Sequence, residues 1–392
     1  MSQTHEIPGL EELDSHSFEL GPIRPPSEAR SLLIRATRNC SWNRCEFCSV
    51  YKGEKFELRS VPDIQRDIDA AKEIADGIKA VARRLGYGES HQRAAALVHD
   101  NLPHNPAVRN VALWLYGGGV SAFLQDANSI IMRTPDLVQV LSHLTRTFPD
   151  LRRITSYGRS RNAAKKSPEE FTQIREAGLS RIHIGLESGC DEVLACVQKG
   201  CTAEHHVKGG RAVVEAGIEL SEYVMPGLGG RRWSQSHVQE TARVLNEIDP
   251  HFIRIRSFQA YENMPMWQQI EHGGFELLRE DEIVEEIGAF IERLDCHSTI
   301  KSDHMMNILM EVEGKLPEDK QKMLAPIHDF VALSEDEKLN FMVGRRLGWY
   351  RTLDDLQVPA RRAKVDEALQ RLQSEGYESA ESIMVSLKMQ HL

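Results

Sequence analysis

The sequence predicts an α/β protein whose strands form a parallel sheet. Short apolar runs alternate about six times with stretches that carry apolar residues at helical spacing. The phrase Glu-Ala-Gly precedes an apolar run twice, at 176–178 and 215–217, which is typical of repeated αβ units. Such alternation requires right-handed crossovers. Because six units cannot close an eight-fold barrel, we expect a partial (β/α)6 TIM-like barrel with an all-helical C-terminal extension.

Each strand is expected where a short apolar run occurs, and each helix where a capping residue precedes apolar residues at helical spacing. Residues 86–108 are polar and contain two prolines, so we expect an irregular excursion or a lid there. The strands are expected at 31–37, 111–116, 153–157, 181–186, 218–225 and 252–258. The helices are expected at 60–85, 134–148, 167–178, 202–217, 236–248, 280–293, 303–313, 318–332, 334–346, 354–374 and 377–389.

Length and composition are those of an ordinary globular protein. The 392 residues predict an N-terminal lead-in over 1–30, a barrel core over 31–262 and a helical extension over 263–392. No apolar run approaches the ~20 residues that span a bilayer, and the acidic start has no signal-peptide pattern. The net charge of −10 argues against non-specific nucleic-acid binding. Seven cysteines without a disulfide pattern suit a reducing cytoplasm.

The first predicted strand leads directly into a cysteine-rich loop. Cys40, Cys45 and Cys48 are spaced C-x4-C-x2-C, and closely spaced thiolates favour zinc, copper(I) or iron–sulfur clusters. A structural zinc site needs four protein ligands, whereas a four-iron cluster held by three cysteines leaves one iron open. A zinc site that borrows a histidine or a distant cysteine is the alternative from this pattern alone.

This loop resembles that of the radical S-adenosylmethionine (radical SAM) superfamily. The resemblance implies that Cys40, Cys45 and Cys48 hold a [4Fe-4S] cluster whose fourth iron is chelated by S-adenosyl-L-methionine (SAM). The commonest family spacing is C-x3-C-x2-C, so this chain has one extra residue in the first gap. Phe47 stands where the family has an aromatic residue that helps to seat the adenine.

Unusual loops follow the next two predicted strands. The resemblance implies that Gly117, Gly118 and Gly119 correspond to a Gly-Gly-Glu-like motif whose carbonyls receive the methionine amino group, with Gly119 in place of the usual acid. A tight turn is the plain alternative. Ser156 and Arg159 stand where the family places polar side chains near the carboxylate or ribose of SAM, although a surface arginine is an equally simple interpretation of Arg159.

The loops after the last three predicted strands carry further candidates. Glu187 follows a buried run, where a charged residue needs a partner, and the resemblance implies that it binds the ribose hydroxyls. Met225 and Gly227 lie in a turn like the family's Gly-Leu-Pro-Gly turn, which packs on adenine. Arg256 could face the substrate or balance a carboxylate within the barrel.

The resemblance covers residues 32–258 and points to the branch that contains the methylthiotransferases, the Elongator catalytic subunit and oxygen-independent coproporphyrinogen oxidase. It implies an oxygen-sensitive enzyme in which flavodoxin or ferredoxin reduces the cluster. SAM is then cleaved to methionine and a 5′-deoxyadenosyl radical, which abstracts hydrogen from a small-molecule substrate. We expect no membrane partner and no nucleic acid.

Two non-catalytic functions stay open from the sequence: a zinc- or cluster-bearing binding module, and an electron-transfer protein whose cluster has four protein ligands. An auxiliary cluster is a further alternative for the other four cysteines, although their spacing matches no standard run. Asp303 and His304 could face the substrate, or a helix cap could explain Ser302 and Asp303. The other four cysteines are Cys190, Cys196, Cys201 and Cys296.

Overall fold

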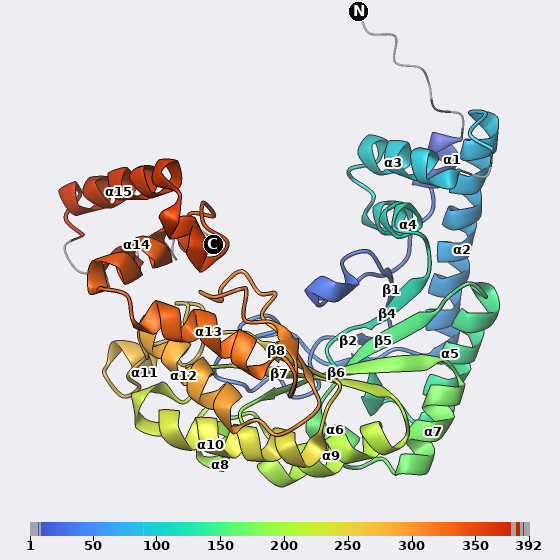
Figure 1. The fold of residues 1–392 in the computed structure, drawn as a ribbon. Coiled ribbons are helices and arrows are strands. Elements are labelled where there is room, and N and C mark those ends of the chain that lie inside the picture. The colour runs from blue at the N-terminus through green and yellow to red at the C-terminus, as the bar shows by residue number, and fades with distance from the viewer. Residues whose placement is uncertain (1–6, 8, 89, 378–381, 385–386, 388–392) are drawn as a thin grey trace, which may run out of the picture. The chain divides into compact units, whose positions relative to one another are not determined.

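The computed structural model describes residues 7, 9–88, 90–377, 382–384 and 387 (Figure 1). The chain forms two compact units, each built from segments that are distant in sequence. The first comprises Met1–Asn43, Val50–Ile184 and Lys208–Leu220, and the second comprises Arg44–Ser49, Gly185–Val207 and Ser221–Leu392. The predicted division at residues 30 and 262 stays a prediction.

The first unit is organised around parallel strands that follow one another in chain order. β1 (Leu32–Arg35) pairs with β4 (Ser121–Gln125), β4 pairs with β5 (Arg153–Gly158), and β5 pairs with β6 (Leu179–Glu187). All three pairings are parallel, so the carboxyl ends of these strands lie at one edge of the sheet. A separate antiparallel pair is formed by β2 (Thr37–Arg38) and β3 (Glu57–Leu58).

The helices of this unit form where capping residues precede an apolar stripe. α2 (Val61–Arg84) begins after Ser60, whose side chain accepts a hydrogen bond from the Asp63 amide, as the sequence predicts. Its isoleucines are fully buried, and it packs against α5 (Thr134–Thr147). The other helices are α1 (Leu10–Asp14), α3 (His91–Asn101), α4 (Pro106–Tyr116), α6 (Ser160–Ala163), α7 (Pro168–Glu176) and α9 (Ala203–Glu215).

The prediction of a strand at 111–116 is wrong, because these residues belong to α4. The Asn105 side chain caps this helix by accepting from the Val108 amide, and Pro106 occupies its first turn. The helix is apolar on most sides and almost wholly buried, and periodicity cannot distinguish such a run from a strand. The second strand is β4, further along the chain. α3 also replaces much of the irregular excursion expected at 86–108.

The second unit continues the parallel pattern. β7 (Glu219–Val224), β8 (Phe252–Ile255) and β9 (Thr299–Lys301) are parallel, and β10 (Gly314–Lys315) pairs antiparallel with β9. α10 contacts α12, which contacts α13. The helices are α8 (Asp191–Cys196), α10 (Gly230–Ile248), α11 (Trp267–Glu271), α12 (Glu280–Arg293), α13 (Lys320–Val331), α14 (Glu335–Arg346) and α15 (Pro359–Ser374).

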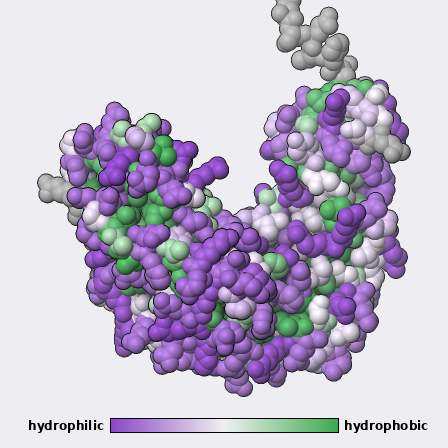
Figure 2. Space-filling view, in the orientation of Figure 1, coloured by the Kyte–Doolittle hydropathy of each residue, from purple (hydrophilic) through white to green (hydrophobic). Residues whose placement is uncertain are grey.

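The α/β class with mainly parallel strands is therefore confirmed, with differences near the C-terminus. The short strands β9 and β10 lie in the part expected to be helical, and residues 303–313 form no helix. The helix expected at 377–389 falls largely outside the described residues. Hydrophilic residues predominate on the face shown in Figure 2. Among the described residues, none of the helices has the length and apolar character needed to span a bilayer.

The N-terminal segment places a buried carboxylate beside β5 and β6. Glu28 ends the short 3-10 helix Pro26–Glu28, accepts a hydrogen bond of 2.6 Å from the Ser31 hydroxyl, and lies 3.1 Å from the Arg153 guanidinium. Burial by itself would raise the pKa of this carboxyl group. The His183 imidazole 3.7 Å away, the hydrogen bond from Ser31 and the charge of Arg153 together outweigh burial, so the pKa of Glu28 lies below its ordinary value of 4.5.

Replacing Glu28 with glutamine is expected to lower the free energy of unfolding by about 3 kcal/mol at pH 7, because a buried ion pair is broken. A carboxyl group with a lowered native pKa stabilises the fold fully above its unfolded pKa, and this contribution is lost as the pH falls through the native pKa. The difference between wild type and variant should therefore shrink at about pH 3.5. Urea unfolding at both pH values measures it, with exposed Glu335→Gln as the control. An equal difference at both pH values would contradict this account.

Candidate functional site

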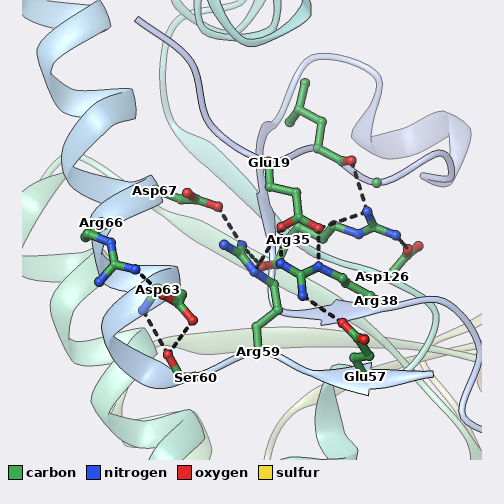
Figure 3. A network of polar contacts seen from close by, with 12 residues as sticks. Glu19, Arg35, Arg38, Glu57, Arg59, Ser60, Asp63, Arg66, Asp67 and Asp126 are labelled. Carbon is green, nitrogen blue, oxygen red and sulfur yellow. Dashed lines mark hydrogen bonds and ion pairs between the residues drawn. The ribbon is translucent and has the colours of Figure 1, made fainter. Parts of the chain in front are cut away.

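An arginine–carboxylate network supports the start of the cysteine loop (Figure 3). Glu19, from the N-terminal segment, lies 3.0 Å from Arg35, 2.7 Å from Arg38 and 3.3 Å from Arg59. The hydrogen bond from Arg38 is the main reason that the pKa of Glu19 lies below its usual value. The Arg59 guanidinium also donates to the Arg35 carbonyl at 2.7 Å. These contacts fix the backbone at the end of β1, where the loop begins.

Asp126, directly after β4, connects both ends of this loop. Its fully buried carboxylate lies 2.9 Å from Arg35 and accepts a hydrogen bond of 3.3 Å from the Asn39 amide, next to Cys40. The Tyr51 hydroxyl, which follows the third cysteine in sequence, donates to the same carboxylate. Asp126 thus holds residues on both sides of the cysteine motif. Asp126 could not be predicted from sequence as a residue at a strand end, because the strand expected at 111–116 is a buried helix and the strand before Asp126 is β4.

Cys40 lies in a tight turn within the first unit. Asn39 and Asn43 have φ angles of 65° and 52°, in the left-handed region that asparagine tolerates better than most residues. The Asn43 amide lies 3.4 Å from the Cys40 sulfur, and the Asn43 side chain donates to the Tyr51 carbonyl. This turn presents a partly exposed thiol whose sulfur already accepts a backbone hydrogen bond.

Arg159 lies beside the same loop. The Asn128 side chain donates to the Ser41 hydroxyl at 2.9 Å and accepts from the Arg159 amide at 3.1 Å. The Arg159 guanidinium lies 5.3 Å from the centre of the Trp42 ring, within cation–π distance. The structure therefore places Arg159, which was predicted from sequence, next to Ser41 and Trp42. Asn128 was missed, although a polar residue soon after the run Phe123–Leu124 was the available signal.

The predicted glycine loop and the predicted Ser156 do not lie with the residues around Cys40. The expectation that Gly117, Gly118 and Gly119 follow a strand is wrong, since they end α4 and precede β4. They therefore lie at the amino end of β4, away from the edge where the cysteine loop begins. Ser156 is buried within β5, and its hydroxyl donates to the Tyr157 carbonyl at 3.0 Å.

In the second unit, Cys45 and Cys48 pack against a buried apolar cluster that includes Phe47 and Met225. Backbone hydrogen bonds hold the intervening residue, because the Glu46 amide donates to the Val197 carbonyl and the Glu46 carbonyl accepts from the Met266 amide. The cluster consists of Phe47, Cys190, Val193, Val197, Met225, Leu228, Phe258, Met266 and Phe275. Phe47 and Met225 thus belong to one cluster. Both are expected from sequence to contact the adenine of SAM.

Glu187 forms a shielded ion pair with Lys199. The two charged groups are 2.9 Å apart, both side chains are 12% exposed, and the ammonium lies 5.5 Å from the centre of the Phe47 ring. Burial would lower the pKa of Lys199, but the charge of Glu187 outweighs it and raises this pKa. Glu187 has a φ of 63°, and its carbonyl accepts from the Met225 amide at 3.0 Å. No sequence pattern pointed to Lys199 as the partner of Glu187.

The Gly227 turn and Ser188 each contact a residue that is far away in sequence. Gly227 has a φ of 86°, which favours glycine, and its amide donates to the Glu286 carboxylate at 2.6 Å. Burial lowers the pKa of His237 to about 4, so this imidazole is neutral at pH 7 and shares a hydrogen bond of 2.8 Å with the Ser188 hydroxyl. No sequence pattern connected Glu286 or His237 with the turn.

The remaining polar candidates have structural partners. Asp303 pairs with Arg254, and the Ser302 hydroxyl donates to the Leu309 carbonyl, so the helix-cap explanation of Ser302 and Asp303 is wrong. Burial is the main cause that lowers the pKa of His304 to about 4. Arg256 is exposed, and its amide donates to the Val224 carbonyl at 2.9 Å.

None of the seven cysteines forms a disulfide. The Cys190 thiol lies 3.1 Å from the Glu192 carboxylate, and Cys201 lies 3.3 Å from the His206 imidazole. Over the part of the chain that the structure describes, no group of three or more His, Cys, Asp or Glu side chains is arranged to hold a metal ion. The donor chemistry of Cys40, Cys45 and Cys48 nevertheless fits an iron–sulfur cluster, because all three thiols are partly exposed on one short loop.

No family model matches this chain. Two curated relatives match about a third of it, and both are named tRNA uridine(34) acetyltransferase. The protein of Methanocaldococcus infernus is 24% identical over 127 residues, which is 31% of this chain and 23% of the relative. The protein of Methanocaldococcus jannaschii is 23% identical over 123 residues, covering 30% and 22% respectively. The match thus spans less than a quarter of either relative.

Among solved structures, the chain is similar to two proteins described as radical SAM enzymes and to an archaeal Elp3. TsrM from Kitasatospora setae, a radical SAM methyltransferase, aligns with a TM-score of 0.43 and 14% identity over 68% of this chain and 42% of its own. HemN from Escherichia coli, a coproporphyrinogen III oxidase and radical SAM enzyme, aligns with a TM-score of 0.37 and 14% identity, over 44% of this chain and 40% of its own. Elp3 from Methanocaldococcus infernus aligns with a TM-score of 0.40 and 14% identity, over 56% of this chain and 55% of its own.

Proposed function

We propose that this protein is a radical SAM enzyme in which Cys40, Cys45 and Cys48 hold a [4Fe-4S] cluster. The observation that carries the proposal is a loop with three partly exposed thiols, placed directly after the first parallel strand. The carboxyl ends of parallel strands are where such α/β folds place their chemistry. Three thiolates satisfy three of the four irons, so a fourth iron stays available for SAM.

The cluster and SAM, when bound, supply the reductive cleavage that yields methionine and a radical able to abstract hydrogen from a substrate. The chain supplies the binding surface. We assign Phe47 and Met225 to the adenine, because both belong to the apolar cluster that also contacts Cys45 and Cys48. Gly227 shapes the turn after Met225, and the amide of Gly227 is already used by Glu286.

Two charged residues are assigned to the polar parts of SAM. Glu187 is the candidate for the ribose hydroxyls, because Lys199 lies 2.9 Å from one of its carboxylate oxygens and leaves the other oxygen outside that contact. Arg159 is the candidate for the methionine carboxylate, since its backbone and guanidinium are fixed beside Ser41 and Trp42. Gly117, Gly118, Gly119 and Ser156 are left out of this assignment.

The enzyme would need an electron donor and a substrate. The reductant would be flavodoxin or ferredoxin, and the substrate would be a small molecule, because the net charge of −10 disfavours nucleic acid. A cytoplasmic location would suit an oxygen-sensitive cluster and seven thiols.

The proposal is tested by reconstituting the protein anaerobically with iron and sulfide, then adding SAM and dithionite. We expect about four iron atoms per chain and the formation of methionine and 5′-deoxyadenosine in equal amounts. A sample without dithionite is the control and should yield neither product. A colourless protein that binds a single zinc ion, or a brown protein that leaves SAM intact, would contradict the proposal.

A further inference from the structure

A basic cleft lies in the first unit, at the amino ends of β5 and β6. Its volume is about 590 Å³, and its lining includes four arginines and one carboxylate. Arg153 is the first residue of β5, and Arg181 lies near the start of β6. The candidate site for SAM involves residues at the opposite ends of these strands, since Arg159 follows β5. The lining includes Arg152, Arg153, Arg175, Arg181, Gly217 and Glu219.

Two of the four arginines are balanced by carboxylates. Arg181 lies 2.7 Å from Glu219, and Arg153 lies 3.1 Å from the buried Glu28. Arg152 and Arg175 form no ion pair with any carboxylate among the described residues. The cleft therefore carries an excess of two positive charges, in a chain whose net charge is −10.

The backbone around the cleft places three of these arginines along its lining. The Arg175 guanidinium lies over Gly217, because a Cβ atom built at Gly217 would be 3.4 Å from Arg175 Nε and 3.5 Å from its Cζ. Gly217 has a φ of 73°, so glycine suits this position for its backbone as well. The amides of Arg152 and Arg153 both donate to the Val120 carbonyl, at 2.9 and 3.3 Å.

One donor within this cleft has no protein partner. Arg153 Nε is buried and makes no hydrogen bond with any described residue. A buried donor without an acceptor costs free energy. One guanidinium group can bind two oxygens of a phosphate through two parallel hydrogen bonds.

We propose that this cleft binds a small molecule that carries a phosphate or pyrophosphate group. Its volume falls within the range of about 300–1,000 Å³ that is common for small-molecule sites. Arg152 and Arg175 contribute the uncompensated charge. The net charge of −10 favours a compact ligand over an extended polyanion such as RNA. This site does not depend on the proposed radical SAM function.

Isothermal titration of the wild-type chain with pyrophosphate and with ADP tests the proposal, since neither needs the cluster. We expect saturable binding that weakens with added sodium chloride. Arg152→Gln and Arg175→Gln should each weaken binding by about tenfold, whereas Arg175→Lys should weaken it less because it keeps the charge. Arg133→Gln is the matched control, because its side chain is 81% exposed and outside the cleft, and it should bind as wild type does.

Three outcomes would overturn the proposal. The first is the absence of saturable binding of either probe to the wild-type chain up to about 1 mM. The second is equal binding by wild type and both glutamine variants, which would place the anion elsewhere on the surface. The third is tighter binding of a short RNA through Arg152 and Arg175, which would make this cleft part of a nucleic-acid surface. Arg152 and Arg175 are exposed, so the variants should fold, and circular dichroism checks this.

Discussion

Replacing Cys45 with serine is expected to reduce the iron bound after anaerobic reconstitution from about four atoms per chain to less than one. Serine keeps the size of the side chain but removes the soft sulfur donor that iron–sulfur clusters require. Cys40→Ser and Cys48→Ser should have the same effect, since each would leave only two thiolates. Iron and acid-labile sulfide analysis, together with the absorbance of the brown chromophore, measures the loss.

Cys296→Ala is the matched control, because Cys296 is buried and lies outside the cysteine loop. This variant should keep its full iron content. A cluster that survives in Cys45→Ser would contradict the assignment of the three ligands. Loss of the cluster in Cys296→Ala, with the fold intact, would point instead to the electron-transfer alternative, in which a fourth protein ligand closes the cluster.

Replacing Lys199 with methionine is expected to lower the free energy of unfolding by about 3–5 kcal/mol, because it leaves the shielded Glu187 carboxylate without its partner. The reconstituted variant should also bind SAM at least about tenfold more weakly, since Glu187 loses the ammonium that holds its carboxylate and the Phe47 ring loses its cation contact. Urea unfolding and equilibrium dialysis with SAM measure the two effects separately.

The double variant Lys199→Met/Glu187→Gln separates stability from binding. Removing both charges should recover part of the lost stability, because no uncompensated charge stays buried. It should not recover SAM binding, because the ribose would still lack its carboxylate. Lys72→Met, in a more exposed pair on α2, is the control and should change either quantity little. If the double variant binds SAM as tightly as wild type, Glu187 does not contact the ribose.

Much of the fold could be predicted because local rules and tertiary packing agree. Ser60 caps α2 and Ser167 forms a capping box with Glu170 at the start of α7, as the sequence predicts. β5 and β6 form at the expected apolar runs. The run 111–116 was misassigned because a helix buried on most sides looks like a buried strand. As a result, the glycine loop was expected after the second strand, whereas it precedes β4, and Asp126 was not recognised as the residue that follows that strand.

The candidate site was predictable only where its residues lie close to a strand end. Phe47 and Met225 share a buried cluster, and Arg159 lies beside Trp42, as the positions of their loops suggested. Glu286 and His237 could not be predicted, because they reach the loops after β6 and β7 from helices much later in the chain. Their contribution is a network of buried hydrogen bonds, which leaves no local pattern in sequence.

The central claim is that one iron of the cluster lacks a protein ligand and is occupied by SAM. Electron–nuclear double resonance of the reduced protein, with SAM labelled by nitrogen-15 in its amino group, tests this claim most directly. The account predicts a magnetic coupling between the cluster and the labelled nitrogen. An intact reduced cluster that shows no coupling at saturating SAM would contradict it.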